Sequence, residues 1–156
     1  MNRVDPADRD QDGDAASVER HLLVRTHLRM GFGALLVFVA LGVLLETLHG
    51  FKVPLYLDVG NETRRLMWRL AHAHGTLLSI LNVIYAACAD RFPELGGRLT
   101  SRALLLALAL LPFGFFAGGV VVHGGDPGLP ILLVPVGALA LLVALFNVAV
   151  SAFRLR

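Results

Sequence analysis

The sequence contains a single cysteine, Cys88, among its 156 residues. One thiol forms neither an intramolecular disulfide nor a dithiol redox pair, which excludes disulfide frameworks and membrane dithiol oxidases. Lysine is equally scarce, since 13 of the 14 basic residues are arginine, a usage typical of a GC-rich bacterial genome. Two long stretches, 103–122 and 131–153, contain no acidic or basic residue at all. This absence argues against an ion-coupled transporter built from this chain alone.

Apolar side chains are abundant instead. They make up 56% of the residues, and the mean hydropathy is +0.67. They concentrate in four blocks, at about 30–48, 70–89, 103–122 and 131–153. Each block is long enough to cross a hydrocarbon core of roughly 30 Å as a helix, and lipid forces the backbone to satisfy its hydrogen bonds internally. The predicted fold is therefore all-α: an integral membrane four-helix bundle over residues 20–156.

The basic residues are unevenly distributed among the connections. Ten lie in the N-terminal region, the second connection and the C-terminus, whereas the other side has only Lys52, Arg64, Arg65 and Arg69. Because cytoplasmic loops retain Lys and Arg, the N-terminus and C-terminus are predicted to be cytoplasmic. The expected location is a cell membrane, as a multi-pass protein of the bacterial inner membrane, with the lipid bilayer as its surroundings. No nucleic-acid partner is expected.

Residues 1–19 are rich in acidic side chains and lack aromatic ones, which is typical of a disordered tail. Within them, the spacing from Asp8 to Glu19 resembles the twelve-position calcium loop of the EF-hand family. The resemblance implies calcium ligands at Asp8, Asp10, Asp12, Asp14 and Glu19, with Gly13 at the turn. The sequence departs from the family pattern at Ala15, which occupies the usual branched apolar position, at Pro6 in the entering helix, and in having no second hand.

Four of the six histidines fall at one predicted depth, near the outer boundary. Glu46 lies about 24 Å along the first helix, at about 1.5 Å per residue, and His49 follows one turn later. His72 and His74 lie in the outer part of the second helix, about 200° apart around its axis, and His123 follows the third. Ionisable groups at this depth are expensive unless they are paired or functional, so this layer is the predicted functional site.

Imidazoles from facing helices can hold a haem iron or a transition metal. One interpretation is therefore a redox or cofactor-binding protein, with His49 and His72 as axial ligands and His74 and His123 as substitutes. Glu46 and His49 also have the Glu-x-x-His spacing of di-iron bundles, but the second such motif and two further glutamates are missing. The alternative is that interfacial histidines bond to backbone carbonyls or pair with Glu46 and bind nothing.

Two other classes of function stay open. The stretch Arg69-Leu70-Ala71-His72-Ala73-His74 resembles the Arg-x-Ala-His-x-Asn stretch of the membrane-associated glutathione transferase family, which also has four helices. The resemblance ends within nine residues, because His74 replaces the Asn and Leu77 replaces an acidic residue. It implies at most an amphiphile-binding role, as in a small membrane enzyme acting on an amphiphilic substrate.

The other class is a non-catalytic structural or assembly subunit. Gly114–Gly118 has the small-xxx-small pattern that lets helices approach closely in lipid, and Ala140–Ala144 repeats it. These faces are predicted to pack against a second copy or a larger membrane complex. Asn82 and Asn147 lie at similar predicted depth in the second and fourth helices, where an amide pair would hold the helices together.

Overall fold

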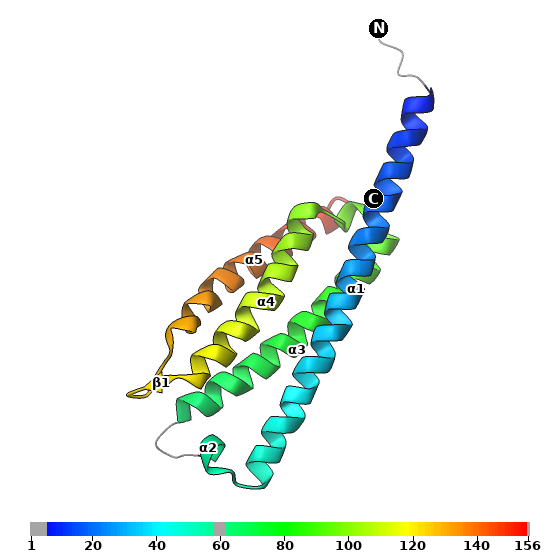
Figure 1. The fold of residues 1–156 in the computed structure, drawn as a ribbon. Coiled ribbons are helices and arrows are strands. Elements are labelled where there is room, and N and C mark those ends of the chain that lie inside the picture. The colour runs from blue at the N-terminus through cyan, green and yellow to red at the C-terminus, as the bar shows by residue number, and fades with distance from the viewer. Residues whose placement is uncertain (1–5, 58–61, 156) are drawn as a thin grey trace.

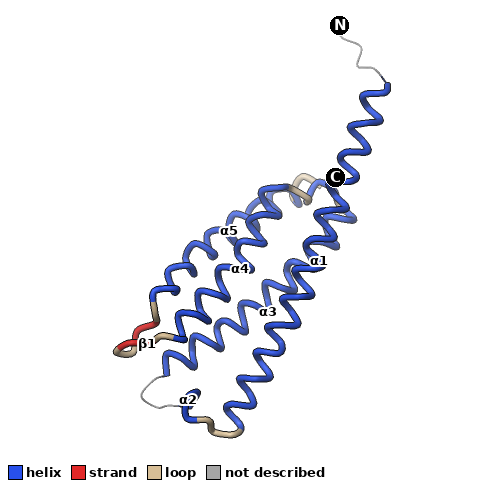
Figure 2. The backbone as a smooth tube through the Cα atoms, viewed as in Figure 1, coloured by secondary structure: helices blue, strands red, loops and turns tan. Residues whose placement is uncertain are grey.

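The computed structural model describes residues 6–57 and 62–155, with side chains from Asp14 onward in the first range. Nearly all of these residues are helical (Figure 1, Figure 2), as predicted for an all-α fold. In chain order the elements are α1 (Pro6–Gly50), α2 (Pro54–Leu57), α3 (Glu62–Arg91), the 3-10 helix η2 (Pro93–Leu95), α4 (Arg98–Val120), strands β1 (Val122–His123) and β2 (Asp126–Pro127), the 3-10 helix η3 (Leu129–Leu132) and α5 (Leu133–Ala152).

Within these two described ranges, four helical segments are long and apolar enough to cross a membrane. They run over Asp14–Gly50, Glu62–Arg91, Arg98–Val120 and Leu129–Ala152. The first two extend well beyond the predicted apolar blocks, because a helix continues through polar residues once its hydrogen-bond ladder is established. Residues 14–19 illustrate this, since Ala15, Ala16 and Glu19 favour helix and Ser17 donates to the Asp14 carbonyl at 2.8 Å.

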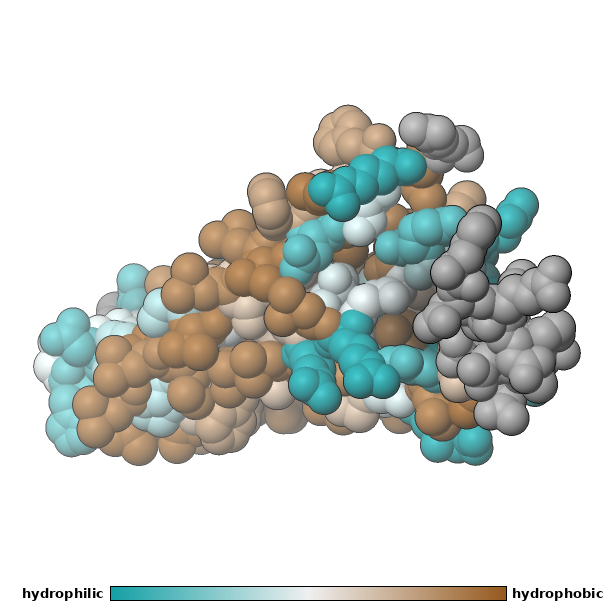
Figure 3. Space-filling view, turned by 90° about the horizontal axis from the view of Figure 1, so that it is seen from above, coloured by the Kyte–Doolittle hydropathy of each residue, from teal (hydrophilic) through white to brown (hydrophobic). Residues whose placement is uncertain are grey.

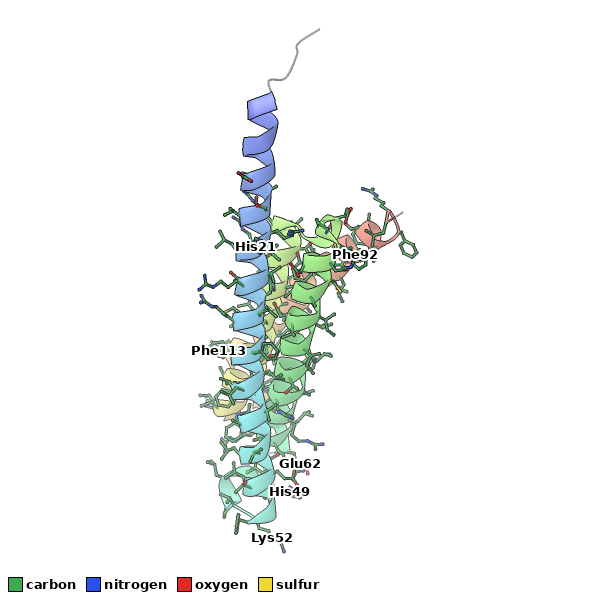
Figure 4. All side chains as sticks on the ribbon, turned by 90° about the vertical axis from the view of Figure 1, so that its right-hand side faces the viewer. His21, His49, Lys52, Glu62, Phe92 and Phe113 are labelled. Atoms are coloured by element: carbon green, nitrogen blue, oxygen red, sulfur yellow. The ribbon has the colours of Figure 1, made fainter. Side chains whose placement is uncertain are left out.

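Each long helix packs mainly against the next one in the chain: α1 against α3, α3 against α4, and α4 against α5 (Figure 1). The helices alternate in direction, so both termini lie at one end of the molecule, hereafter the terminal end. The helix α2 and the β1–β2 strands lie at the opposite end, hereafter the hairpin end. Figure 4 places His49, Lys52 and Glu62 at the hairpin end, and His21 and Phe92 toward the terminal end.

Apolar side chains occupy both the inside and the outside of this array. Leu78 from α3 packs with Ala107, Leu108 and Leu111 from α4 to form a buried cluster. Large apolar side chains also point outward, among them Leu36, Leu139 and Phe146 with 73%, 64% and 70% of their surface exposed. In Figure 3 a broad hydrophobic surface fills the left half of the view, and hydrophilic residues gather at the far left edge and from the centre to the right. This distribution suits a protein surrounded by lipid rather than water.

Glycines let α1 and α3 approach each other closely. A Cβ atom at Gly31 of α1 would lie 2.7 Å from Val83 Cγ2 and 3.1 Å from the Ser79 carbonyl oxygen of α3. The contact is reciprocal farther along, since the His72 ring of α3 packs over Gly42 and the Phe38 ring of α1 packs over Gly75. Close backbone approach is the kind of packing that holds helices together in lipid, where apolar burial gives no driving force for association.

The small residues Gly114, Gly118 and Ala144 are also used inside the chain. A Cβ at Gly114 would lie 2.9 Å from Val134 Cγ2 of α5, and one at Gly118 would lie 3.4 Å from the Ile131 nitrogen of η3. Ala144 is fully buried in a cluster with α3 and α4 residues. These three residues therefore pack within the chain, and the binding of a second copy or a larger complex through the α4 and α5 faces stays a prediction.

Side chains from the start of α3 brace the hairpin end. Arg64 Nε donates to the Gly119 carbonyl at 3.2 Å, and Trp68 Nε1 donates to the Phe116 carbonyl at 3.2 Å. Both acceptors lie in the last two turns of α4, and the Gly119 carbonyl is among the last four, which have no donor within the helix. The buried Tyr56 of α2 stacks on Trp68 with ring centroids 6.4 Å apart. This end of the molecule is therefore cross-linked by donors from α3.

Candidate functional site

A groove of about 1080 Å³ lies between α1 and α3 at the hairpin end; we call it the α1–α3 groove. This volume is comparable to that of a pocket for a sizeable small molecule. Its apolar wall is formed by Val39, Gly42, Val43, Leu45, Leu66, Leu70 and Ala73, and its polar residues are Glu46, His49, Tyr56, Arg65, Arg69 and His72. The helix α1 ends and α3 begins at the hairpin end. Polar residues late in α1 and early in α3 therefore gather toward that end.

The polar residues include three that the sequence had singled out. Glu46 and His49 are exposed, and the His49 ring contacts Tyr56 edge-on with centroids 6.4 Å apart. His72 is half-buried, and its Nδ1 lies 2.7 Å from the Phe38 carbonyl oxygen of α1. A carbonyl can only accept, so Nδ1 carries the hydrogen and Nε2 of the neutral ring holds a lone pair. The structure thus brings Glu46, His49 and His72 to one groove.

His74 and His123 lie elsewhere. His74 Nδ1 donates to the Leu70 carbonyl of its own helix at 2.9 Å, and its ring packs against Phe115 of α4 with centroids 4.9 Å apart. The predicted angular separation of His72 and His74 explains why one faces α1 and the other α4. His123 is exposed on β1, where it lies opposite Asp126 in the register of the two antiparallel strands. The predicted histidine layer therefore divides into separate environments.

The described residues contain no group of three or more His, Cys, Asp or Glu side chains that could hold a metal ion. This finding does not support the predicted transition-metal site built from several of these histidines. A haem needs only two axial imidazoles, and His49 and His72 line the same groove. Haem binding at this pair stays a prediction.

The predicted calcium loop lies within α1, whose backbone is helical from Pro6 onward. The side chains of Asp8, Asp10 and Asp12 lie outside the described residues. Asp14 is exposed, and Glu19 forms an ion pair with Arg98 of α4. A helix spreads side chains around its axis, whereas a calcium loop turns its ligands inward around one ion. The calcium site stays a prediction that would require this segment to change conformation.

The charges in the α1–α3 groove are unequally paired. Arg65 is half-buried and donates to Glu62 one turn earlier at 3.2 Å. Arg69 and Glu46 are both exposed, and neither forms an ion pair with any described residue. Arg69 and Glu46 are therefore the two charged groove residues that no ion pair neutralises within the described part of the chain.

A buried polar cluster at the other end of the α1–α3 interface was missed. His27 of α1 has no exposed surface; its Nδ1 lies 2.7 Å from Asn82 Oδ1 of α3, and its Nε2 lies 2.8 Å from Ser101 Oγ of α4. Tyr85 contacts the ring edge-on at 4.8 Å between centroids. The sequence placed Asn82 in the inner half of a helix, but it gave no sign that its partner was His27 rather than Asn147.

The sequence and the fold were also compared with known proteins. No protein-family model, curated protein or solved structure matches this chain.

Proposed function

We propose that this chain is a multi-pass membrane protein that binds a phospholipid-like amphiphile with a zwitterionic head group in the α1–α3 groove. One observation carries the proposal: an apolar wall leads to a mouth that contains Arg69 and Glu46, two opposite charges without ion-pair partners among the described residues. An acyl chain fits the wall, and a head group with both charges fits the mouth.

The membrane setting rests on the four candidate spans and their outward apolar side chains. In the proposed orientation the terminal end faces the cytoplasm and the hairpin end faces outward. The groove then opens sideways into the outer leaflet, with its polar mouth at the depth of the head groups. A lipid would enter from the bilayer without crossing an aqueous phase.

The head-group chemistry follows from the charges at the mouth. Arg69 is suited to a phosphate, because a guanidinium is permanently charged and binds phosphate oxygens through several donors. Glu46 is suited to an ammonium group. Phosphoethanolamine offers both charges in one head group, and a phosphoglycerol head group offers only the phosphate. The proposal therefore expects selectivity for ethanolamine over glycerol.

Substitution of the two charges tests this selectivity. We expect Arg69→Gln to weaken binding of both phosphatidylethanolamine and phosphatidylglycerol by about 1 kcal/mol, or roughly fivefold. We expect Glu46→Gln to weaken only phosphatidylethanolamine binding, because only that head group carries the ammonium. Native mass spectrometry of the full-length protein with each lipid measures both effects.

Arg102→Gln and Asp90→Asn are matched controls, since both residues are exposed and lie away from the groove. They should leave both affinities unchanged. Equal losses in the controls and the groove variants would show that surface charge alone attracts the lipid, and an unaltered ethanolamine preference in Glu46→Gln would refute the proposed head-group contact.

Haem binding is the second candidate function, and the His72 geometry favours it. Its Nδ1–H donates to the Phe38 carbonyl, an arrangement that commonly orients an imidazole whose other nitrogen binds a metal. His49 lines the same groove. An absorbance spectrum of the purified protein distinguishes the candidates: a Soret band that disappears in both His49→Ala and His72→Ala would replace the lipid proposal, and its absence would exclude haem.

A further inference from the structure

The cluster around His27 lies at the opposite end of the α1–α3 interface from the groove and is independent of the lipid proposal. Asn82 Nδ2 donates to the Leu78 carbonyl at 2.8 Å, so Asn82 Oδ1 faces His27 and accepts the hydrogen of Nδ1. The Ser101 hydroxyl then donates to the Nε2 lone pair. Both nitrogens of the neutral imidazole of α1 are thereby satisfied by partners from two helices, α3 and α4.

Protonation of this ring would disturb the arrangement. A proton from water would add to Nε2, and the Ser101 hydroxyl, which donates to Nε2 in the neutral state, would have to turn round and accept. Within the described part of the chain, the resulting cation would have no carboxylate partner: α3 presents the Asn82 amide and the titratable Tyr85 phenol, and α4 presents Ser101. A buried cation without a counter-ion is strongly unfavourable.

Ser101 is the partner of His27 that lies nearer to solvent. This half-buried residue lines a cavity of about 210 Å³ that opens at the terminal end. The charged groups of that cavity are Glu19 on α1 and Arg98 and Arg102 on α4, and Glu19 is paired with Arg98. The Ser101 hydroxyl thus separates the His27 ring from the cavity and its charged side chains.

We propose that His27 is a proton-binding site that couples pH at the terminal end to the packing of α1: the neutral ring fastens α1 to α3 and α4, and the protonated ring releases it. Neutral pH favours the fastened state. Acidification favours any state in which water reaches the ring, because only there is the imidazolium hydrated. The packing of α1 against α3 and α4 is therefore expected to loosen as pH falls and to re-form as pH rises.

Hydrogen exchange of the full-length protein in lipid nanodiscs tests this proposal. A wetted histidine titrates with a pKa of about 6.5, so lowering the pH from about 7.5 to 5.0 should populate the open state roughly thirtyfold more. The protection factors of peptides over residues 22–34, corrected for intrinsic exchange rates, should fall by that factor. His27→Gln should abolish the pH response, and the exposed His21→Gln on the same helix should retain it (Figure 4).

A wild-type response that persists in His27→Gln, or no response in the wild type, would overturn the proposal. Nitrogen-15 spectra of histidine-labelled wild-type protein provide a second readout if His27→Gln does not fold. His27, His72 and His74 all donate through Nδ1, so three imidazoles should show the Nδ1–H tautomer at about pH 7.5. The signal that remains when His72 and His74 are both replaced by glutamine should convert to imidazolium as protection is lost. Absence of this conversion, or conversion without loss of protection, would equally contradict the proposal that protonation of His27 releases α1.

Discussion

Replacement of Gly31 with leucine is expected to force α1 away from α3 and to lower the free energy of unfolding by about 3 kcal/mol, the upper end of the range for overpacking. At this position an added Cβ would lie 3.1 Å from the Ser79 carbonyl oxygen and 3.2 Å from the Val83 nitrogen. Backbone atoms of a packed helix cannot rotate away as a side-chain tip can. The strain would also stretch the His27–Asn82 hydrogen bond one turn earlier.

Gly33→Leu is the matched control, because a Cβ at Gly33 would meet nothing within 4 Å. It lies two residues away on the same helix, and leucine there should be tolerated or slightly stabilising, since it favours helix more than glycine does. Denaturation of the full-length protein in detergent, followed by circular dichroism, measures both variants. Similar unfolding of the two would show that α1 and α3 are not in the close contact described.

Replacement of Asn82 with leucine is expected to lower the free energy of unfolding by about 2 kcal/mol, because it leaves the His27 Nδ1–H group buried without an acceptor. The cost of one lost bond between membrane helices is smaller, about 0.6 kcal/mol on average, so most of the effect should come from the unsatisfied donor. The same denaturation experiment, performed at neutral pH, measures the change.

Asn147→Leu is the control for this prediction. Asn147 is half-buried in α5, but the described residues provide it with no bond like that of Asn82 to His27. Its replacement should change stability by less than about 0.5 kcal/mol. An Asn147 variant as damaged as the Asn82 variant would favour the amide pair that the sequence had suggested, and would contradict the His27 cluster.

The four apolar helices could be predicted from the sequence because the surrounding solvent sets the length and the composition of such a helix. Length and composition can both be read directly from the residues. The sequence did not predict which residues meet across helix interfaces. The hydrogen bond between His27 and Asn82 joins residues 55 positions apart, and its formation depends on the rotation of α1 that seats Phe38 over Gly75 and His72 over Gly42. No local pattern specifies that rotation.

The candidate site was predicted in part. Depth along the helices brought Glu46, His49 and His72 together correctly, since depth depends only on the rise per residue. Depth alone did not place His74, because the rotation of α3 about its axis turns this ring toward Phe115 of α4. Arg64, one of the four basic residues on the less basic side of the molecule, donates to the end of α4, so a structural contact accounts for part of the charge on that side.

Photocrosslinking tests the central claim most directly. A phosphatidylethanolamine analogue with a diazirine in its acyl chain would be incorporated with the full-length protein into nanodiscs, illuminated, and its adducts mapped to peptides. The lipid proposal predicts adducts concentrated in residues 39–49 and 65–73, and their depletion in Arg69→Gln. Adducts spread evenly over the outward faces of α4 and α5, unaffected by that substitution, would contradict it.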